Sequence, residues 1–522
     1  MLTLVRNMNC SIAKENIHSL LSYEEIIRII NTLQTGLISK NTTINSQNAS
    51  GLHNMEKYLV RSGMSLQQLD TLSVIHVTGT KGKGSTCAFV EAILRNHGFR
   101  TGFYSSPHLV AVRERFRINA KPISEMKFIN YFWPVYNMLN QLKDNPNDMP
   151  PYFKFLTILM FHIFIKENVD VAIIEVGIGG ELDCTNIVRN SVCTGIARLG
   201  LDHTSVLGNT LESIAFQKSG IFKPGAPAFT IPQPRNAMSV LHNRAVEKGC
   251  SLSIVPNLQS YPWKKSQPVL GIPCKVQNHN ASLAIQLASS WMMRHKRRGN
   301  NCSNTSKCMT NDNDADVFNA TNNNNYYVLA NNNNNSPNTS LCFAKVATAL
   351  ETCKWPGRTQ FLPRETMDFY IDGAHTIESI ETCVSWFRDV TVKTGEKRRK
   401  YLIFNITGAR DSASLLNPLK QLGFSKVFFV PNVTGLTTIA DHINANINSN
   451  KEIERCQLHV QIWGENSVTA NSVYDALKMI DGQVNSMSDG YCKPQVLVTG
   501  SLHLVGALLS IIDPNLSLST KC

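Results

Sequence analysis

Residues 72–86 read LSVIHVTGTKGKGST, and this stretch indicates the class of fold. Its first six residues form a short apolar run rich in β-branched side chains, which predicts a buried strand, and a helical pattern follows from Ser85 to His97. Glycines in the turn between them let backbone N–H groups point towards a phosphate, and the helix N-terminus adds a favourable electric field. The order of strand, glycine-rich turn and helix therefore predicts a nucleotide-binding α/β domain.

Lys83 in this turn supplies a flexible positive charge for the terminal phosphates of a nucleotide. The turn departs from the common G-x-x-x-x-G-K-[ST] pattern, because Val77 stands at the first glycine position and Gly84 separates Lys83 from Ser85. A glycine-rich turn without a ligand is the alternative interpretation. The flanking strand and helix, together with the lysine, favour a mononucleotide.

Other apolar runs extend the α/β pattern along the chain. Residues 169–176 are almost wholly apolar and also end in glycines, as do strands of a parallel sheet that helices cover on both faces. A second α/β pattern begins near Met367. Further strands are expected at 194–199, 228–231, 367–373, 400–406, 426–430 and 495–499 and a helix at 377–390. We expect a P-loop parallel-sheet ATPase domain, residues 1–362, followed by a smaller Rossmann-like α/β domain, residues 363–522.

Residues 297–340 differ in composition from the rest of the chain, with two asparagine runs and few large apolar side chains. Such a segment cannot bury enough surface to offset the entropy of ordering it, so we expect a disordered insertion. Residues 359–366 follow this insertion and are expected to form a hinge between the domains.

The composition narrows the partners without choosing among them. The 522 residues carry 51 Lys and Arg against 38 Asp and Glu, a formal net charge of +13, and 43% are hydrophobic. A large core is therefore expected, and the excess positive charge suits nucleic acid, an anionic membrane surface or small polyanions. The most apolar run, residues 155–165, is about half the ~20 residues that span a bilayer, so a buried helix is expected.

The cysteines and the N-terminus bear on the compartment. Fourteen Cys occur without a CxxC pair, which argues against a zinc site or a disulfide framework. The first twenty residues lack a secretory pattern, whereas Arg6 and Lys14 leave a weak mitochondrial presequence open. We expect a cytoplasmic protein, with mitochondria as a second location.

An acidic residue is also expected at the ligand-binding edge of the sheet, beside the glycine-rich turn at residues 78–85, called the phosphate loop below. Glu175 ends a buried strand, at the edge of the sheet where ligands of open α/β folds bind. Beside a triphosphate a carboxylate suits Mg²⁺, although a loop-capping glutamate is the alternative. Alone, His203 and Lys218 indicate little, since single His and Lys residues are common on surfaces.

Together these features resemble the Mur ligase superfamily and, within it, the folylpolyglutamate synthases. The resemblance covers about residues 23–291 and 355–512. It rests on eight stretches in order: VTGTKGKGSTCAF, YSSPHL with VRERFRIN, EVGIGGELDCTN, LDHTSVLG, QKSGIFKPG, WPGRTQ, IDGAHT and VTGSLHLVG. The family commonly has an acid at the position of Ala409, so one polar contact is in doubt.

The resemblance implies roles for individual residues. The nucleotide would contact Gly82, Lys83, Gly84, Ser85, Asn280, Arg358 and Asp372. Two Mg²⁺ ions would be held by Ser106, Glu175, His203 and Lys218, the last as a carbamylated lysine. A P-loop argument alone selects Ser85 for the metal, whereas the resemblance selects Ser106. The catalytic set would be Lys83, His203, Lys218, Asp372 and His375, with Ser501 near the incoming glutamate, and K⁺ would be a further ion.

The activity implied is an ATP-dependent ligase that adds L-glutamate to the γ-carboxyl of tetrahydrofolate and its polyglutamates through an acyl phosphate. A bifunctional dihydrofolate synthase of the same superfamily remains an alternative. The expected partners are the folate, L-glutamate and ATP, without nucleic acid or a membrane span, and the chain is expected to act as a monomer. A basic nucleic-acid-binding module is the non-enzyme alternative, but only short KRR clusters support it.

Overall fold

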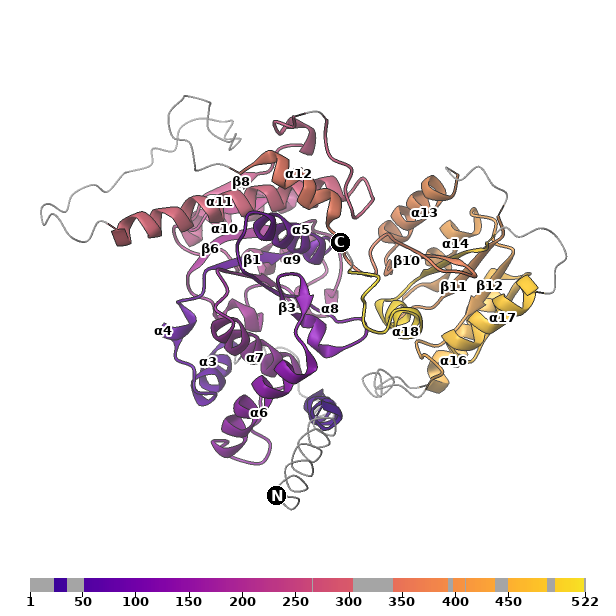
Figure 1. The fold of residues 1–522 in the computed structure, drawn as a ribbon, viewed down its shortest axis with the longest axis horizontal. Coiled ribbons are helices and arrows are strands. Elements are labelled where there is room, and N and C mark those ends of the chain that lie inside the picture. The colour runs from indigo at the N-terminus through magenta and orange to yellow at the C-terminus, as the bar shows by residue number, and fades with distance from the viewer. Residues whose placement is uncertain are drawn as a thin grey trace, which may run out of the picture.

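Figure 1 shows the chain as two α/β units, each built around its own sheet. The computed structural model describes residues 23–34, 51–264, 266–303, 341–392, 398–408, 410–436, 449–485 and 493–520. The expected presequence, most of the expected insertion (residues 304–340) and Ala409 therefore lie outside the described residues.

The first domain has an eight-stranded sheet in the order β4-β3-β2-β5-β1-β6-β7-β8. Its strands are β1 (Val74–Thr78), β2 (Thr101–Tyr104), β3 (Phe116–Ile118), β4 (Lys121–Pro122), β5 (Val171–Glu175), β6 (Ser191–Ile196), β7 (Ala228–Thr230) and β8 (Leu252–Ile254). At one edge, β3 pairs in antiparallel fashion with both β2 and β4, and the other neighbouring strands of this sheet are parallel. Because β1 lies between β5 and β6, the loop after it occupies the place where ligands of open parallel sheets bind.

Helices cover both faces of this sheet. They are α3 (Gly51–Arg61), α4 (Leu66–Leu69), α5 (Lys83–Asn96), α6 (Glu125–Gln141), α7 (Tyr152–Lys166), α8 (Thr204–Leu207), α9 (Leu211–Ser219), α10 (Arg235–Lys248), α11 (Gln277–Ser303) and α12 (Phe343–Thr352), with helical residues 23–34 before them and 3₁₀ turns η1 (Val112–Arg115), η2 (Cys184–Ile187) and η3 (Leu258–Ser260). Alternate side chains of a strand point to opposite faces. Accordingly, Ile75 packs with α5, α11 and α12, whereas Val74 packs with α3, α6 and α7.

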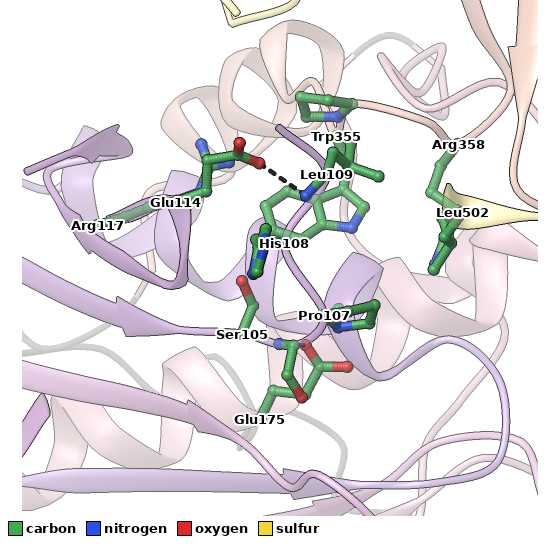
Figure 2. A pocket seen from close by; sticks show the side chains of 13 residues that line it. Ser105, Pro107, His108, Leu109, Glu114, Arg117, Glu175, Trp355, Arg358 and Leu502 are labelled. Carbon is green, nitrogen blue, oxygen red and sulfur yellow. Dashed lines mark hydrogen bonds between the residues drawn. The ribbon is translucent and has the colours of Figure 1, made fainter. Parts of the chain in front are cut away.

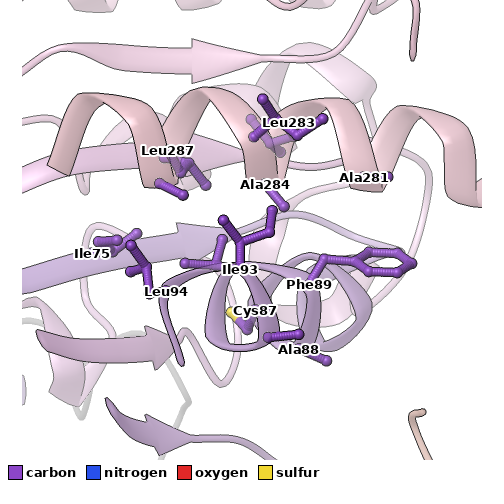
Figure 3. Close-up of a cluster of buried hydrophobic side chains, with 14 of the residues drawn as sticks. Ile75, Cys87, Ala88, Phe89, Ile93, Leu94, Ala281, Leu283, Ala284 and Leu287 are labelled. Carbon is purple, nitrogen blue, oxygen red and sulfur yellow. The ribbon is translucent and has the colours of Figure 1, made fainter. Parts of the chain in front are cut away.

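Helix α5 packs against α11, as Figure 3 shows. Phe89 and Ile93 of α5 share one buried cluster with Ala284 and Leu287 of α11. Small alanine side chains allow two helices to approach closely, and the close packing fixes one helix relative to the other. The first turn of α11 consequently lies beside the start of α5, where the glycine-rich loop ends.

Helix α7 confirms the expected buried helix, since residues 155–161 are all buried. No helix in the described ranges has the length and apolar content needed to cross a membrane.

The second domain has a six-stranded sheet in the order β13-β12-β11-β14-β10-β9. Its strands are β9 (Gln360–Pro363), β10 (Asp368–Asp372), β11 (Lys400–Phe404), β12 (Lys426–Phe429), β13 (Ser467–Thr469) and β14 (Gln495–Thr499), and its helices are α13 (Ile377–Val392), α14 (Ser412–Lys420), α16 (Ser449–Trp463), α17 (Val473–Asn485) and α18 (Leu502–Ile512). All pairs are parallel except β9 with β10. Helices α17 and α18 cover one face, and α13, α14 and α16 cover the other. The fold class expected from the sequence is confirmed.

Three details differ from the sequence-based expectation. Strand β6 ends at Ile196, because Arg198 leaves the sheet and its carbonyl binds the backbone N–H groups of Thr80 and Lys81. Residues 360–363 form β9 and pair with β10, so part of the segment expected as a hinge, 359–366, belongs to the second sheet, and the hinge itself stays a prediction. Helix α11 continues to Ser303, into the first residues of the expected insertion. The domain division at 362/363 stays a prediction, and β9 spans it.

Candidate active site

The glycine-rich loop leaves β1 and enters α5 through a backbone conformation that favours glycine. Gly82 has φ of 88° and stands immediately before α5. A Cβ on Gly82 would lie 2.4 Å from Oδ1 of Asn280, which is buried in the first turn of α11. Only a residue without a side chain fits there, so the loop backbone remains open to a ligand at the N-terminus of a 14-residue helix.

Two lysine ammonium groups meet at this loop. Lys83 Nζ and Lys218 Nζ donate to the same carbonyl, that of Gly79, at 3.1 and 3.0 Å. Lys218 is 3% exposed, and burial together with the charge of Lys83 lowers its pKa to about 7. The charge of Lys83 at this carbonyl favours an anion, and the lowered pKa leaves much of Lys218 as a neutral amine near pH 7.

Glu175 and Ser106 meet at the carboxyl ends of neighbouring strands. The Ser106 backbone N–H donates to Glu175 Oε2 at 3.2 Å. Glu175 is 5% exposed, and burial raises its pKa while the charges of Lys83 and Arg358 oppose this shift. A buried carboxylate at the edge of a cationic site has the oxygen donors that Mg²⁺ prefers.

Glu175 and Ser106 line one pocket between the two domains, shown in Figure 2. Gly84, Ser106 and Glu175 come from the first domain, and Arg358 and Leu502 come from the linker and the second domain. A Cβ on Gly84 would lie 3.4 Å from Glu175 Oε2, so the phosphate loop and this carboxylate are close neighbours. The pocket thus joins the two halves of the expected site.

Arg113, Arg115 and Arg117 alternate along the VRERFRIN stretch after β2, a spacing that also suits a solvated strand with outward arginines, but two of the three are not solvated. Arg115 and Arg117 are buried. Arg115 Nε donates to His108 Nδ1 at 3.0 Å, and the Arg117 guanidinium lies 5.0 Å from the ring centre of Trp355. Arg117 lines the pocket directly, and Arg115 supports His108, which also lines it.

His203 lies apart from this buried group. It is exposed, has φ of 52° and precedes α8, and its backbone N–H donates to Asp202 Oδ1 at 3.0 Å. Burial of part of the ring lowers the pKa of His203, and the charges of Lys83 and Lys218 add to this effect. The imidazole is therefore within electrostatic reach of the lysine pair and exposed to solvent. In the described part of the chain, no three His, Cys, Asp and Glu side chains form a metal-binding group.

The linker contributes Arg358, and the second domain contributes Asp372 and His375. Asp372 Oδ2 accepts the backbone N–H of Thr359 at 2.7 Å. Burial raises the pKa of Asp372, and the positive charge of Arg358 opposes that shift. His375 hydrogen-bonds with Lys81 Nζ of the phosphate loop at 2.8 Å, so this part of the second domain reaches the first. Ser501 precedes α18, and its hydroxyl accepts the backbone N–H of His503.

Trp355 has a place in the site that the sequence did not indicate. Its indole Nε1 would lie 3.1 Å from a Cβ on Gly84, and its ring centre is 5.2 Å from that of Phe103. In the WPGRTQ stretch only Arg358 was predicted to be a site residue. The signal in the sequence that could have indicated Trp355 is a large aromatic residue just before the domain linker.

A buried polar chain supports the loop that follows Glu175. His76 Nε2 and Thr185 Oγ1 are 2.8 Å apart, and the Thr185 hydroxyl donates to Asp183 Oδ1 at 2.5 Å. Asp183 Oδ2 accepts the backbone N–H of Ile178 at 3.1 Å. The sequence did not predict this support, because the contact between His76 and Thr185 joins residues 109 positions apart.

Comparison with known proteins gives consistent results. The family described as "Dihydrofolate synthetase, C-terminal domain" matches residues 358–511. The chain is 38% identical to the mitochondrial folylpolyglutamate synthase of Homo sapiens over 95% of this chain and 93% of the relative. It is 36% identical to a folylpolyglutamate synthase of Saccharomyces cerevisiae over 94% of this chain and 87% of the relative.

Solved structures share the fold. A folylpolyglutamate synthase from Thermotoga maritima superposes with a TM-score of 0.65 at 23% identity, covering 95% of this chain and 97% of that chain. The Mycobacterium tuberculosis folylpolyglutamate synthase complexed with ADP superposes with a TM-score of 0.68 at 20% identity, covering 95% and 99%.

Proposed function

The chain belongs to the folylpolyglutamate synthase family, and we propose that its interdomain pocket joins L-glutamate to the γ-carboxyl group of tetrahydrofolate and its polyglutamates with ATP. The observation that supports this most is one pocket lined by Gly84 of the phosphate loop, the buried Glu175, Arg358 of the linker and Leu502 of the second domain. Such a pocket brings a nucleotide phosphate and a second substrate together.

The chemistry explains why ATP is needed. A carboxylate is a poor acyl donor, because oxide would have to leave. An oxygen of the folate γ-carboxylate therefore attacks the γ-phosphorus of ATP, ADP leaves, and an acyl phosphate forms. The amine of L-glutamate, after losing a proton, attacks the acyl carbon, and phosphate leaves as the amide forms. The protein positions these anions and offsets their charge.

The nucleotide is assigned to the loop and its neighbours. The backbone from Gly82 to Ser85 would bind phosphates at the start of α5, and Lys83 would exchange its bond with the Gly79 carbonyl for a phosphate oxygen. Asn280 lies against Gly82 and would contact the nucleotide beyond the phosphates. Arg358 would hold it from the linker, and Asp372 from the second domain. One solved relative is a complex with ADP, which supports nucleotide use.

The donor set near Glu175 fits Mg²⁺. The pair Ser106 and Glu175 is assigned to one ion, and His203 with Lys218 to a second, where carbamylation would convert the Lys218 amine into a carboxylate. When bound, Mg²⁺ neutralises phosphate charge and polarises the phosphoryl group. The buried, unprotonated Lys218 amine is the form that reacts with CO₂. Ser85 is buried at the start of α5 and stays with the nucleotide. K⁺ is a further ion that we propose for activity assays.

One assay tests the proposal. Purified protein receives ATP, Mg²⁺, tetrahydrofolate and L-glutamate, and we expect ADP together with a folate product heavier by one glutamate residue. Omitting either the folate or glutamate should abolish product formation. ATP binding without any product from several folates would contradict the proposal.

A second assay, with dihydropteroate in place of the folate, tests the alternative of a bifunctional dihydrofolate synthase. The matching family is described as a dihydrofolate synthetase domain, so dihydropteroate is the relevant second substrate. We propose that this chain prefers the folate. Comparable turnover of dihydropteroate would replace the proposal with the bifunctional one.

The cellular setting is a separate proposal. The name of the human relative places that protein in mitochondria. We propose the cytoplasm for this chain with mitochondria as a second location, which fractionation of cells would test. We also propose a monomer, because the phosphate loop and Arg358 of one chain already share a pocket. Size-exclusion chromatography with light scattering would test this.

A further inference from the structure

Lys81 lies in the phosphate loop, but its ammonium group contacts the other domain. Its Nζ is 3.2 Å from Asp202 Oδ2 and 2.8 Å from His375 Nε2. Lys83, two residues later, instead donates to the Gly79 carbonyl. The two lysines of this loop therefore have different partners, and only the second points at the carbonyl shared with Lys218.

The backbone of the loop fixes where the Lys81 side chain begins. The N–H groups of Thr80 and Lys81 both donate to the carbonyl of Arg198, at 2.8 and 3.1 Å. The Thr80 hydroxyl donates to the Gly200 carbonyl at 3.0 Å. These bonds tie the loop to the segment after β6, which also carries Asp202, so both ends of the Lys81–Asp202 pair have the same anchor.

The partners of His375 determine its hydrogen-bonding state. Its Nδ1 is 2.7 Å from the Gly373 carbonyl, which can only accept, so Nδ1 carries the proton. The Lys81 ammonium can only donate, so Nε2 is the acceptor. Burial and the charge of Lys81 lower the pKa of His375 to about 3, in keeping with a neutral ring. His375 is thus a neutral imidazole with one fixed tautomer.

We propose that Lys81 is a positioning residue that joins the phosphate loop to the second domain and orients His375 for the incoming amino acid. The Lys81 ammonium donates a hydrogen bond to Nε2, and Nδ1 donates one to the Gly373 carbonyl, so hydrogen bonds at both nitrogens fix the orientation of the ring. Arg358 and Arg410 add positive charge around the same ring, which suits a substrate with two carboxylates. This inference rests on the proposed function, which assigns His375 to L-glutamate.

The test is a double-mutant cycle on Lys81 and His375. Lys81→Met keeps a side chain of similar length but cannot donate a hydrogen bond to His375. We expect the KM for glutamate to rise by about 10-fold. The dissociation constant for ATP should stay within about threefold, and Lys81→Arg should recover part of the loss. Adding Lys81→Met to His375→Ala should change the KM for glutamate no further, because the two act as a unit. Lys345→Met, at an exposed lysine on α12, is the matched control.

Two results would overturn the inference. Additive effects in the cycle would show that Lys81 acts independently of His375. A loss of ATP affinity as large as the loss for glutamate would make Lys81 a phosphate ligand.

A spectroscopic readout covers the case in which His375→Ala has no measurable turnover. In ¹⁵N-histidine-labelled protein, Lys81→Met should shift the Nε2 resonance of His375 and leave Nδ1 in place. An unchanged Nε2 resonance would refute the contact. If the wild type lacks ligase activity, the proposed function fails, whereas this resonance still tests the contact between Lys81 and His375.

Discussion

Gly82 and Asn280 are in such close contact that a Cβ on Gly82 would lie 2.4 Å from Asn280 Oδ1. The contact joins the start of α5 to the first turn of α11 and closes one side of the phosphate loop. The nucleotide site thus depends on the packing of two helices as well as on the loop itself.

Gly82→Ala should therefore impair nucleotide binding. The substitution forces a side chain into φ of 88° and against Asn280, and we expect the KM for ATP to rise by at least about 10-fold. Gly98→Ala is a matched control, since Gly98 has φ of 94° but no atom within 4 Å of its Cβ position. Equal effects of both variants on the KM for ATP would show that the contact with Asn280 is irrelevant.

Lys83→Ala should lower kcat by about 100-fold or more, because the variant lacks the charge that offsets the developing negative charge of the transferred phosphoryl group. The fold should persist, since within the described part of the chain the lysine donates only to a loop carbonyl. ADP release measures the loss, and circular dichroism checks the fold. Retained turnover would refute the phosphate role of Lys83.

Lys218 should carry a carbamate under CO₂. Its amine is buried at the Gly79 carbonyl, where a neutral form can react. We expect native mass spectrometry in bicarbonate to show one added carboxyl group that Lys218→Arg lacks. We also expect short carboxylic acids to restore part of the activity of Lys218→Ala. The absence of both effects would remove the carbamate from the proposal.

The strand, loop and helix from residues 74 to 96 were predictable because their signals are local. Apolar residues mark β1, glycines mark the turn, and the 3.6-residue period marks α5. The position of Glu175 at the end of a buried strand was also predictable for the same reason. What the local pattern does not contain is the strand order, in which β5, rather than β2, lies next to β1.

Contacts across long distances in sequence account for the other differences. Arg115 and Arg117 alternate like outward residues of a strand, yet His108, Ala120 and Trp355 provide partners that allow burial. Trp355 is more than 200 residues away along the chain, so no window around the arginines could reveal it.

Asp148 should stabilise the first domain in a pH-dependent way. The Asp148 side chain is 11% exposed, and burial alone would raise the pKa of its carboxyl group. Hydrogen bonds from Arg61, Lys57 and Tyr58 outweigh burial and hold this pKa well below 3.8. A carboxyl group with a lowered pKa in the folded state stabilises the fold fully at a pH above its unfolded-state pKa. This stabilisation is lost as the pH falls through the folded-state pKa.

Asp148→Asn should therefore reduce the free energy of unfolding at pH 7 by about 1–2 kcal/mol. The difference from wild type should shrink as the pH falls below about 4. Urea titrations at several pH values measure both quantities. A difference that stays constant down to pH 3 would mean that the charge of Asp148 contributes nothing.

The stacking of Arg117 on Trp355 should stabilise the wall of the pocket. Arg117 is 5% exposed, its guanidinium lies 5.0 Å from the ring centre, and its NH1 group donates to the Ala120 carbonyl at 3.2 Å. Arg117→Met removes the charge over the ring and the bond to Ala120, and we expect a loss of about 2 kcal/mol in unfolding free energy.

Two further variants separate these contributions. Trp355→Phe keeps an aromatic face with weaker attraction for a cation, so it should cost less than Trp355→Leu. If the stack contributes, Arg117→Met should cost less in the Trp355→Leu background than in the wild type, because the cation has already lost its ring. Because Trp355 also lies against Gly84, the Trp355→Leu variant should also gain less thermal stability from added ATP than the wild type does. Equal ATP-induced shifts in Tm would show that the wall and the phosphate loop are independent.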